Sequence, residues 1–279
     1  MNRILFEKEE IKDGVVTFDD VRAEHVLTVL HGEVGQVLKT GEINGLIGTS
    51  EIVSIVPRAV SAAVSTSQLR LPAAGGDAPR YGAVTIRVNH TEPSLQPWVD
   101  LILAPPRPRA MKRLLPQLAT MGVGRIFLVG AKKVEKDFWG ATLLKEENYR
   151  PLLIDGLMQA GTSILPTLET RRNFRKFVNE ELDTLWPTAN RIVAHPYDTV
   201  PRCVPARGEV TAGLEAPRAG THRGTVLAIG PEGGWTDEEV ALLESKGFRR
   251  YSLGPRILRT DTATIALLAR LGTKEHTND

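Results

Sequence analysis

The sequence is poor in cysteine and has no long apolar run. Cys203 is the single cysteine among 279 residues, so no disulfide can form within the chain and a cysteine-built metal cluster is excluded. No stretch of about 18 consecutive apolar residues occurs, which predicts that no helix spans a membrane. The first residues, MNRILFEKEE, are charged almost at once and lack the apolar core of a signal peptide. We therefore expect a cytoplasmic protein in a reducing compartment.

A large excess of either charge is also missing. Lysine and arginine together number 35 against 33 aspartates and glutamates, and the net charge of +2 neither requires nor excludes a nucleic-acid partner. The six histidines show no ligand-like spacing, so we expect no metal. Basic residues do cluster locally, in PPRPRAMKRLL (105–115) and RRNFRK (171–176). One such cluster is usually a solvated helix face, whereas several together modestly favour a partner that carries phosphate groups.

The pattern of apolar residues divides the chain in two. Short apolar runs separated by glycines predict a small β-rich domain over residues 1–92, with a flexible Ala-, Gly- and Pro-rich insertion at about 65–82. From residue 93 to 279, short apolar strands alternate with helical patterns. That alternation is typical of an α/β domain in which helices cover both faces of a parallel sheet.

Four of the predicted strands end at a proline, in Ala104-Pro105, His195-Pro196, Gly230-Pro231 and Gly254-Pro255. Proline cannot continue the hydrogen-bond ladder of a sheet, so each pair indicates a sharp strand exit. Ligands bind at the carboxyl ends of the strands in open α/β sheets. The three later turns are therefore predicted to form the walls of a single pocket.

Two stretches near the C-terminus carry the strongest chemical signals. In LAIGPEGGWTDEEV, the three glycines predict a loop whose main chain a ligand can approach closely. Thr236 and Glu239 predict a capping box at the start of the next helix. This pattern fits either a tight connection without a ligand or a ligand site. In YSLGPRILRTDTATIALL, Arg256 and Arg259 flank Ile257-Leu258. Such a loop suits an anionic or π-rich ligand, although exposed salt bridges are the simpler explanation.

These two stretches, at this spacing, resemble the C-terminal signature of the RsmE-type ribosomal RNA methyltransferases of the SPOUT class. RIVAHP and LPQLATMGVGRIFLV are similar to earlier segments of that family, and NRILF and EHVLTVL to its small RNA-binding domain. The resemblance implies a parallel sheet with a C-terminal trefoil knot, preceded by a PUA-like β-barrel. It also implies a homodimer that uses S-adenosylmethionine, without a metal, to methylate N3 of a uridine in small-subunit (16S-type) ribosomal RNA.

Residue roles follow from the matched positions. Arg256 or Arg259 would stabilise negative charge on the base, and Glu232 or Asp261 could accept its proton, although the sequence favours a structural role for both carboxylates, as partners of an arginine or as helix caps. From charge clustering and domain position, we expect contact with RNA phosphates from Arg3, Arg107, Arg109, Lys112 and Arg113. The residues expected to bind the methyl donor are His195, Pro196, Ile229, Gly230, Pro231, Glu232, Gly233, Gly234, Leu253, Gly254, Ile257, Leu258, Arg259 and Thr262.

The chain also departs from the family pattern. Residues 108–112 stand where the family has a different motif at the start of the first helix of the methyltransferase domain. At three further positions this chain has Met158 in place of a glutamate before Gln159, His31 in place of an arginine, and Asp261 in place of a glutamate. The donor-binding motifs are intact, whereas the altered ones face the RNA or lie near the expected dimer contact. Two alternatives therefore remain: a SPOUT enzyme with another RNA target, or an RNA-binding assembly factor without catalytic activity.

Overall fold

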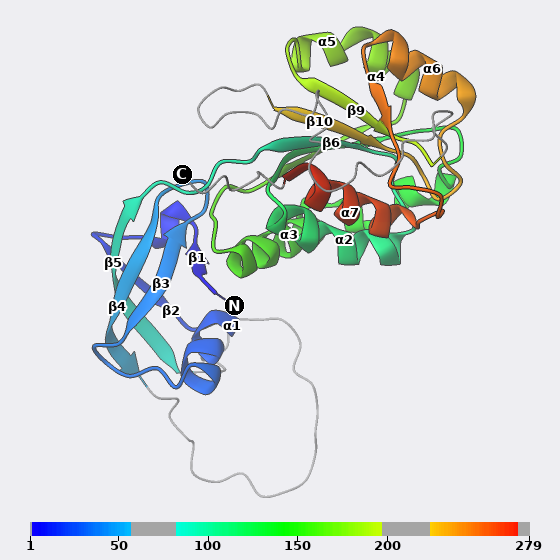
Figure 1. Ribbon diagram of the computed structural model, residues 1–279. Coiled ribbons are helices and arrows are strands. Elements are labelled where there is room, and N and C mark those ends of the chain that lie inside the picture. The colour runs from blue at the N-terminus through cyan, green and yellow to red at the C-terminus, as the bar shows by residue number, and fades with distance from the viewer. Residues whose placement is uncertain (1, 57–81, 197–223, 273–279) are drawn as a thin grey trace, which may run out of the picture. The chain divides into compact units, whose positions relative to one another are not determined.

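The computed structural model describes residues 2–56, 82–196 and 224–272 (Figure 1). Most of the predicted insertion at about 65–82 lies outside these residues, as does Cys203. The chain forms two compact units. The N-terminal unit consists of Met1–Leu95 together with Gly161–Ser163, and the C-terminal unit consists of Gln96–Ala160 and Ile164–Asp279. No pattern in the sequence predicts that Gly161–Ser163 belong to the N-terminal unit.

A five-stranded sheet builds the N-terminal unit. β1 pairs in parallel with β3, and the remaining neighbours in the order β1-β3-β4-β5-β2 are antiparallel. The strands are β1 (Ile4–Phe6), β2 (Val15–Phe18), β3 (Val37–Glu42), β4 (Ile47–Val56) and β5 (Ala83–Glu92), with the short helices η1 (Lys8–Glu10), α1 (Val21–Glu24) and η2 (His25–Val29). Their buried side chains, among them Phe6, Phe18 and Ile52, form one apolar core.

The helix α1 continues into η2 as a π-helical turn, and this changes which residues face the core. A regular helix would place Val21, His25, Val26 and Val29 on one face. In the structure, however, Val21 and Val29 are 68% and 60% exposed while Ala23 and Val26 are buried. The i→i+5 bond from the N–H of Leu30 to the carbonyl of His25 widens the turn and rotates the apolar positions.

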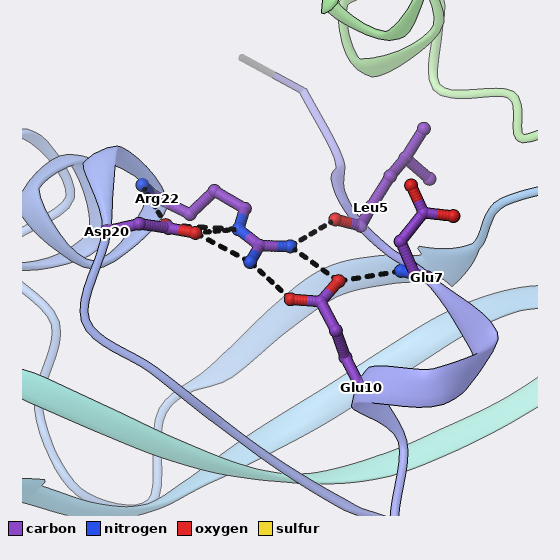
Figure 2. A network of polar contacts seen from close by, with 5 residues as sticks. All are labelled: Leu5, Glu7, Glu10, Asp20 and Arg22. Carbon is purple, nitrogen blue, oxygen red and sulfur yellow. Dashed lines mark hydrogen bonds and ion pairs between the residues drawn. The ribbon is translucent and has the colours of Figure 1, made fainter. Parts of the chain in front are cut away.

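Arg22 connects α1 to β1 and η1 (Figure 2). Its guanidinium donates hydrogen bonds to the main-chain oxygen of Leu5, 3.0 Å away, and to the carboxylates of Glu10 and Asp20. The same group lies over the ring of Phe6, 4.9 Å from its centroid. One side chain thus satisfies a buried carbonyl, two carboxylates and an aromatic face, which fixes the local arrangement of three elements.

The C-terminal unit contains a six-stranded sheet in the order β11-β9-β10-β6-β7-β8, and every neighbouring pair is parallel. The predicted parallel sheet is therefore confirmed. The strands are β6 (Val99–Leu103), β7 (Val123–Val129), β8 (Thr167–Arg171), β9 (Asn190–Ala194), β10 (Thr225–Ile229) and β11 (Arg249–Tyr251). The central strand β10 is buried along its whole length, as expected of a strand with helices on both sides.

Helices cover both faces of this sheet, which makes the unit a three-layer α/β structure (Figure 1). One face carries α2 (Pro108–Thr120), α3 (Glu146–Ala160) and α7 (Thr260–Gly272), and the other carries α4 (Phe174–Glu180), α5 (Leu182–Leu185) and α6 (Asp237–Ser245). Two short 3-10 turns, η3 (Lys136–Gly140) and η4 (Thr142–Leu144), lead into α3. None of the helices in the described part of the chain is both long and apolar enough to cross a lipid bilayer.

Candidate functional site

The three later proline turns converge on one cavity in the C-terminal unit. Its volume is about 290 Å³, and it lies at the carboxyl ends of β9, β10 and β11, with the first turns of α7 as its remaining wall. The lining residues are Ala194, His195, Pro196, Ile229, Gly230, Pro231, Glu232, Gly233, Gly234, Trp235, Tyr251, Leu253, Gly254, Arg256, Ile257, Leu258, Thr260, Ala263 and Leu267. This position is where ligands bind in open parallel sheets.

Most of the residues expected to bind a ligand lie around this cavity. The exceptions are Arg259 and Thr262, which do not line it. Sequence reasoning missed Ala194, Trp235, Tyr251, Thr260, Ala263 and Leu267. Trp235 directly follows the glycine-rich loop, and this position in the sequence could have identified it as a lining residue. Thr260, Ala263 and Leu267 all belong to α7 and lie within its first two turns.

The loop after β10 is held by its own hydrogen bonds. The N–H of Gly234 donates to the carbonyl of Pro231 at 2.8 Å, and Gly234 adopts a positive φ of 70°. The predicted capping box is confirmed, because the N–H of Thr236 donates to Glu239 Oε2 at 2.8 Å and the N–H of Glu239 donates to Thr236 Oγ1 at 3.3 Å. Since α6 begins immediately after the loop, its cap fixes one end of the cavity wall.

The loop after β11 is tied to the turn after β9. The N–H of His195 donates to the carbonyl of Tyr251 at 3.1 Å, and the hydroxyl of Ser252 donates to the carbonyl of Pro196 at 3.2 Å. The same hydroxyl accepts a hydrogen bond from the N–H of Gly254, also at 3.2 Å. Gly254 has a φ of +112°, a backbone conformation that a residue with a Cβ rarely adopts. Two of the three turns therefore form a single connected wall.

The N-terminus of α7 contacts the third turn. Thr260 is buried and its hydroxyl donates to the carbonyl of Gly230 at 3.3 Å, while Thr264 Oγ1 donates to the carbonyl of Thr260 at 2.6 Å. The chain leaves β11 at the edge of the sheet, yet α7 begins against the exit of β10, two strands further in. Segments near residues 195, 230 and 260 thus enclose the same space.

Charged side chains stand at the rim of the cavity. Arg256 and Arg259 are exposed, and within the described part of the chain neither has an ion-pair partner. Glu232 lies 3.7 Å from Arg107 Nε, and that nitrogen also donates to Glu135 Oε1 at 3.1 Å. The exposed ion pairs hold Glu232 only weakly. The rim consequently offers the guanidinium of Arg256, which has no ion pair with any residue that the structure describes, and the paired carboxylate of Glu232.

The residues predicted to contact RNA phosphates differ in how available they are. Arg3 donates to the carbonyls of Thr40, Gly48 and Gly161 at 2.6, 2.8 and 2.9 Å, and burial lowers the pKa of its guanidinium. Arg107 is paired as described above, and Arg113 NH2 lies 3.4 Å from Asp261 Oδ2. Arg109 and Lys112 are exposed on α2 and have no ion-pair partner in the described ranges. Of the five predicted residues, these two have no ion pair within the part of the chain that the structure describes.

The lining of the cavity is mostly main chain and apolar side chain. Ile257 is 72% exposed and Leu258 37% exposed at its rim, so the protein itself leaves these apolar groups uncovered. A ligand with a flat ring would cover them, and its polar edges could bond to main-chain groups of the glycine-rich loop. In the described residues no cluster of three or more histidine, cysteine, aspartate or glutamate side chains could hold a metal ion.

Comparison with known proteins gives consistent matches over nearly the whole chain. Residues 93–272 match the family described as an RNA methyltransferase domain. The ribosomal RNA small subunit methyltransferase E of Treponema pallidum is 30% identical over 274 residues, which cover 96% of this chain and 90% of the relative. Ribosomal RNA small subunit methyltransferase E 1 of Borreliella burgdorferi is 23% identical and covers 95% of both chains.

Solved structures share the fold. A ribosomal RNA small subunit methyltransferase E from Neisseria gonorrhoeae, bound to S-adenosyl methionine, superimposes with a TM-score of 0.66 at 19% identity over 97% of this chain and 96% of the other. The putative methyltransferase Lpg2936 from Legionella pneumophila, in complex with the cofactor SAM, gives a TM-score of 0.63 at 23% identity over the same shares.

Proposed function

The chain belongs to the family of ribosomal RNA small subunit methyltransferase E, and from this premise we propose that it transfers a methyl group from S-adenosylmethionine to N3 of a uridine in small-subunit ribosomal RNA. The convergence of three proline turns on one cavity carries the proposal. A methyl donor must be held rigidly, because positioning is the main catalytic task in a direct group transfer.

The lining residues fit the proposed donor. Ile257 and Leu258 offer apolar surface to an adenine ring, while Gly230, Gly233 and Gly234 offer main chain that a ligand can approach closely. When bound, the donor supplies a methyl group on a positively charged sulfur, and its leaving group is neutral. Among the chain's own residues, the loops at 195–196, 229–234 and 253–258 would bind and orient it.

The chemistry at the base requires loss of a proton. As the bond between N3 and the methyl carbon forms, the bond between that carbon and sulfur breaks, and the proton on N3 passes to a base. Arg256, which lines the cavity, and the nearby Arg259, both exposed, would stabilise negative charge on the uracil oxygens. Glu232 lines the cavity and is the proposed acceptor of the proton. Its pairing with Arg107 also fits a purely structural role.

We propose that RNA lies across the rim and the exposed face of α2. Arg109 and Lys112 are free there to contact phosphates, whereas Arg3 is already engaged by three carbonyls. We also propose that the sheet of the N-terminal unit is a PUA-like RNA-binding barrel. The family resemblance supports that assignment.

Two further features of the fold are proposals. The first is that the C-terminal segment is threaded as a trefoil knot, which is supported by the return of the chain from β11 to a contact between Thr260 and Gly230. The second is that the enzyme is a homodimer, as the resemblance implies. Sedimentation analysis of the full chain tests the dimer, and an experimental structure tests the threading.

The function itself is tested in two steps. Isothermal titration with S-adenosylhomocysteine should show one site per chain, and absence of binding would favour an assembly factor without catalytic activity. Nucleosides from small-subunit RNA of a strain lacking the gene are then analysed by mass spectrometry. Loss of N3-methyluridine, restored by the wild-type gene, is the expected result. An unchanged level together with loss of a different methylated nucleoside would establish another RNA target.

A further inference from the structure

The segment after β7 reaches across to the glycine-rich loop that lines the cavity. Lys133 Nζ donates a hydrogen bond to the carbonyl oxygen of Gly233 at 2.8 Å. The aliphatic part of the same side chain lies against this glycine, since a Cβ added to Gly233 would stand 3.0 Å from Lys133 Cδ. Nothing in the sequence motifs around the loop indicates that a residue 100 positions earlier in the chain supports it.

The contact bears on one particular peptide group. The peptide that joins Gly233 to Gly234 has its carbonyl bonded to Lys133 and its N–H bonded to the carbonyl of Pro231 at 2.8 Å. A peptide between two glycines can rotate more freely than any other, because neither flanking residue has a Cβ to restrict it. Bonds at both of its polar ends therefore fix a peptide plane that the local sequence leaves loose.

We propose that Lys133 is a positioning residue for the donor site, which sets the orientation of the Gly233–Gly234 peptide before the ligand arrives. This inference rests on the proposed function, because the site it serves is the proposed methyl-donor site. A charged donor makes the stronger kind of hydrogen bond, and a wall that is already ordered lowers the entropic cost of binding. Without the ammonium group, the ligand itself would have to order the peptide.

The neighbouring residue provides a matched control. Lys132 is also exposed, but its main-chain N–H rather than its ammonium group makes the contact here, donating to Glu239 Oε1 of α6 at 2.7 Å. Lys132→Ala therefore removes the same charge from the adjacent position and leaves this main-chain bond and the bond from Lys133 to Gly233 in place. Lys133→Arg restores a charged donor at the original position.

The experiment measures the affinity of S-adenosylhomocysteine by calorimetry for the full-length wild type and the three variants. Lys133→Ala should bind roughly three- to tenfold more weakly, Lys133→Arg should recover most of the loss, and Lys132→Ala should match the wild type. Amide exchange without ligand gives a second readout, in which the peptide containing Gly233 and Gly234 exchanges faster in Lys133→Ala alone.

Several outcomes would overturn the proposal. Wild-type affinity in Lys133→Ala excludes a positioning role, and an equal loss in Lys132→Ala attributes the effect to net charge. If a methylation assay of the same variants shows a change confined to the KM for RNA, Lys133 contacts RNA phosphate instead. If the wild type itself binds no S-adenosylhomocysteine, the proposed function is wrong, whatever the role of Lys133. If amide exchange of the loop is the same in Lys133→Ala as in the wild type, Lys133 does not order the loop.

Discussion

The hydroxyl of Thr260 donates a hydrogen bond to the main-chain oxygen of Gly230, 3.3 Å away. This bond joins the first residue of α7 to the exit of β10, and both residues are buried. The shape of the cavity depends on that junction, because α7 forms one wall and the loop after β10 forms another.

We predict that Thr260→Val weakens both the fold and donor binding. Valine has nearly the same shape but no hydroxyl, so the carbonyl of Gly230 would remain buried without this donor, at a cost of about 1–2 kcal/mol. Thermal unfolding should begin at a lower temperature, and the Kd for S-adenosylhomocysteine should rise several-fold. Thr260→Ser keeps the hydroxyl and serves as the control; equal behaviour of the two variants would contradict the prediction.

A second prediction separates catalysis from donor binding at the rim. Arg259 does not line the cavity, whereas Arg256 does. If either guanidinium stabilises charge on the base, its replacement by alanine should lower kcat by about a hundredfold or more. Arg259→Ala should leave the affinity for S-adenosylhomocysteine unchanged. Single-turnover methylation assays measure the rate, and full activity in both single variants would exclude these arginines from the reaction.

A third prediction concerns the free cations of α2. Arg109→Glu combined with Lys112→Glu should weaken RNA binding at least tenfold and reduce the salt dependence by about one unit of slope per lost phosphate contact. Donor binding should not change. The matched control is Arg175→Glu with Lys176→Glu on α4, which makes the same change in charge on the other face of the sheet. If both double variants lose the same amount of RNA affinity, the effect comes from net charge and not from contacts made by α2.

Features that depend on local backbone chemistry were predictable from the sequence. Proline at the end of an apolar run indicates a strand exit, and parallel strands bring such exits to one edge, so the cavity at His195, Gly230 and Gly254 followed from three separate dipeptides. The capping box of Thr236 and Glu239 is equally local. In each case the controlling interaction lies within a few residues of the signal.

Features that depend on distant partners were not predictable. The strand β8, with the sequence TLETR, lies at the edge of the sheet and is largely exposed, so it lacks an apolar pattern. Arg3 was assigned to RNA because its charge is visible in the sequence, whereas its acceptors come from β3, β4 and residue 161. The contact of Lys133 with Gly233 was hidden for the same reason.

A fourth prediction tests the packing of α2 against α3. A Cβ on Gly156 would lie 2.1 Å from the main-chain oxygen of Pro116, and a backbone atom cannot rotate out of the way. Gly156→Ala should therefore destabilise the C-terminal unit by about 1–3 kcal/mol, despite the higher helix propensity of alanine, which is worth up to about 1 kcal/mol. Gly140→Ala is the control, since no atom lies within 4 Å of its Cβ position. Urea unfolding of both variants gives the comparison, and equal midpoints would contradict the predicted clash.

A fifth prediction concerns the pH dependence of the N-terminal unit. Burial alone would raise the pKa of Glu10 and of Asp20, but hydrogen bonds and the charge of Arg22 outweigh it and lower both pKa values below their usual 4.5 and 3.8. Carboxyl groups with a lowered pKa in the folded state stabilise it above their unfolded pKa and lose that contribution as the pH falls through the folded value. The contribution of the ion pairs of Arg22 with Glu10 and Asp20 is therefore complete at neutral pH and is lost in acid.

Arg22→Met should destabilise the N-terminal unit by about 2 kcal/mol at neutral pH, because Arg22 is only 16% exposed and two carboxylates lose their partner. The difference from wild type should shrink steadily as the pH is lowered from about 5 to about 2. Arg87→Met removes an exposed arginine whose carboxylate partner is 3.9 Å away, and should change stability by less than about 0.5 kcal/mol. Denaturant titrations across this pH range, with hydrogen exchange of β1 to localise the loss, measure the effect. A difference that stays constant with pH would show that Arg22 stabilises the unit through its contacts with Leu5 and Phe6 rather than through the two carboxylates.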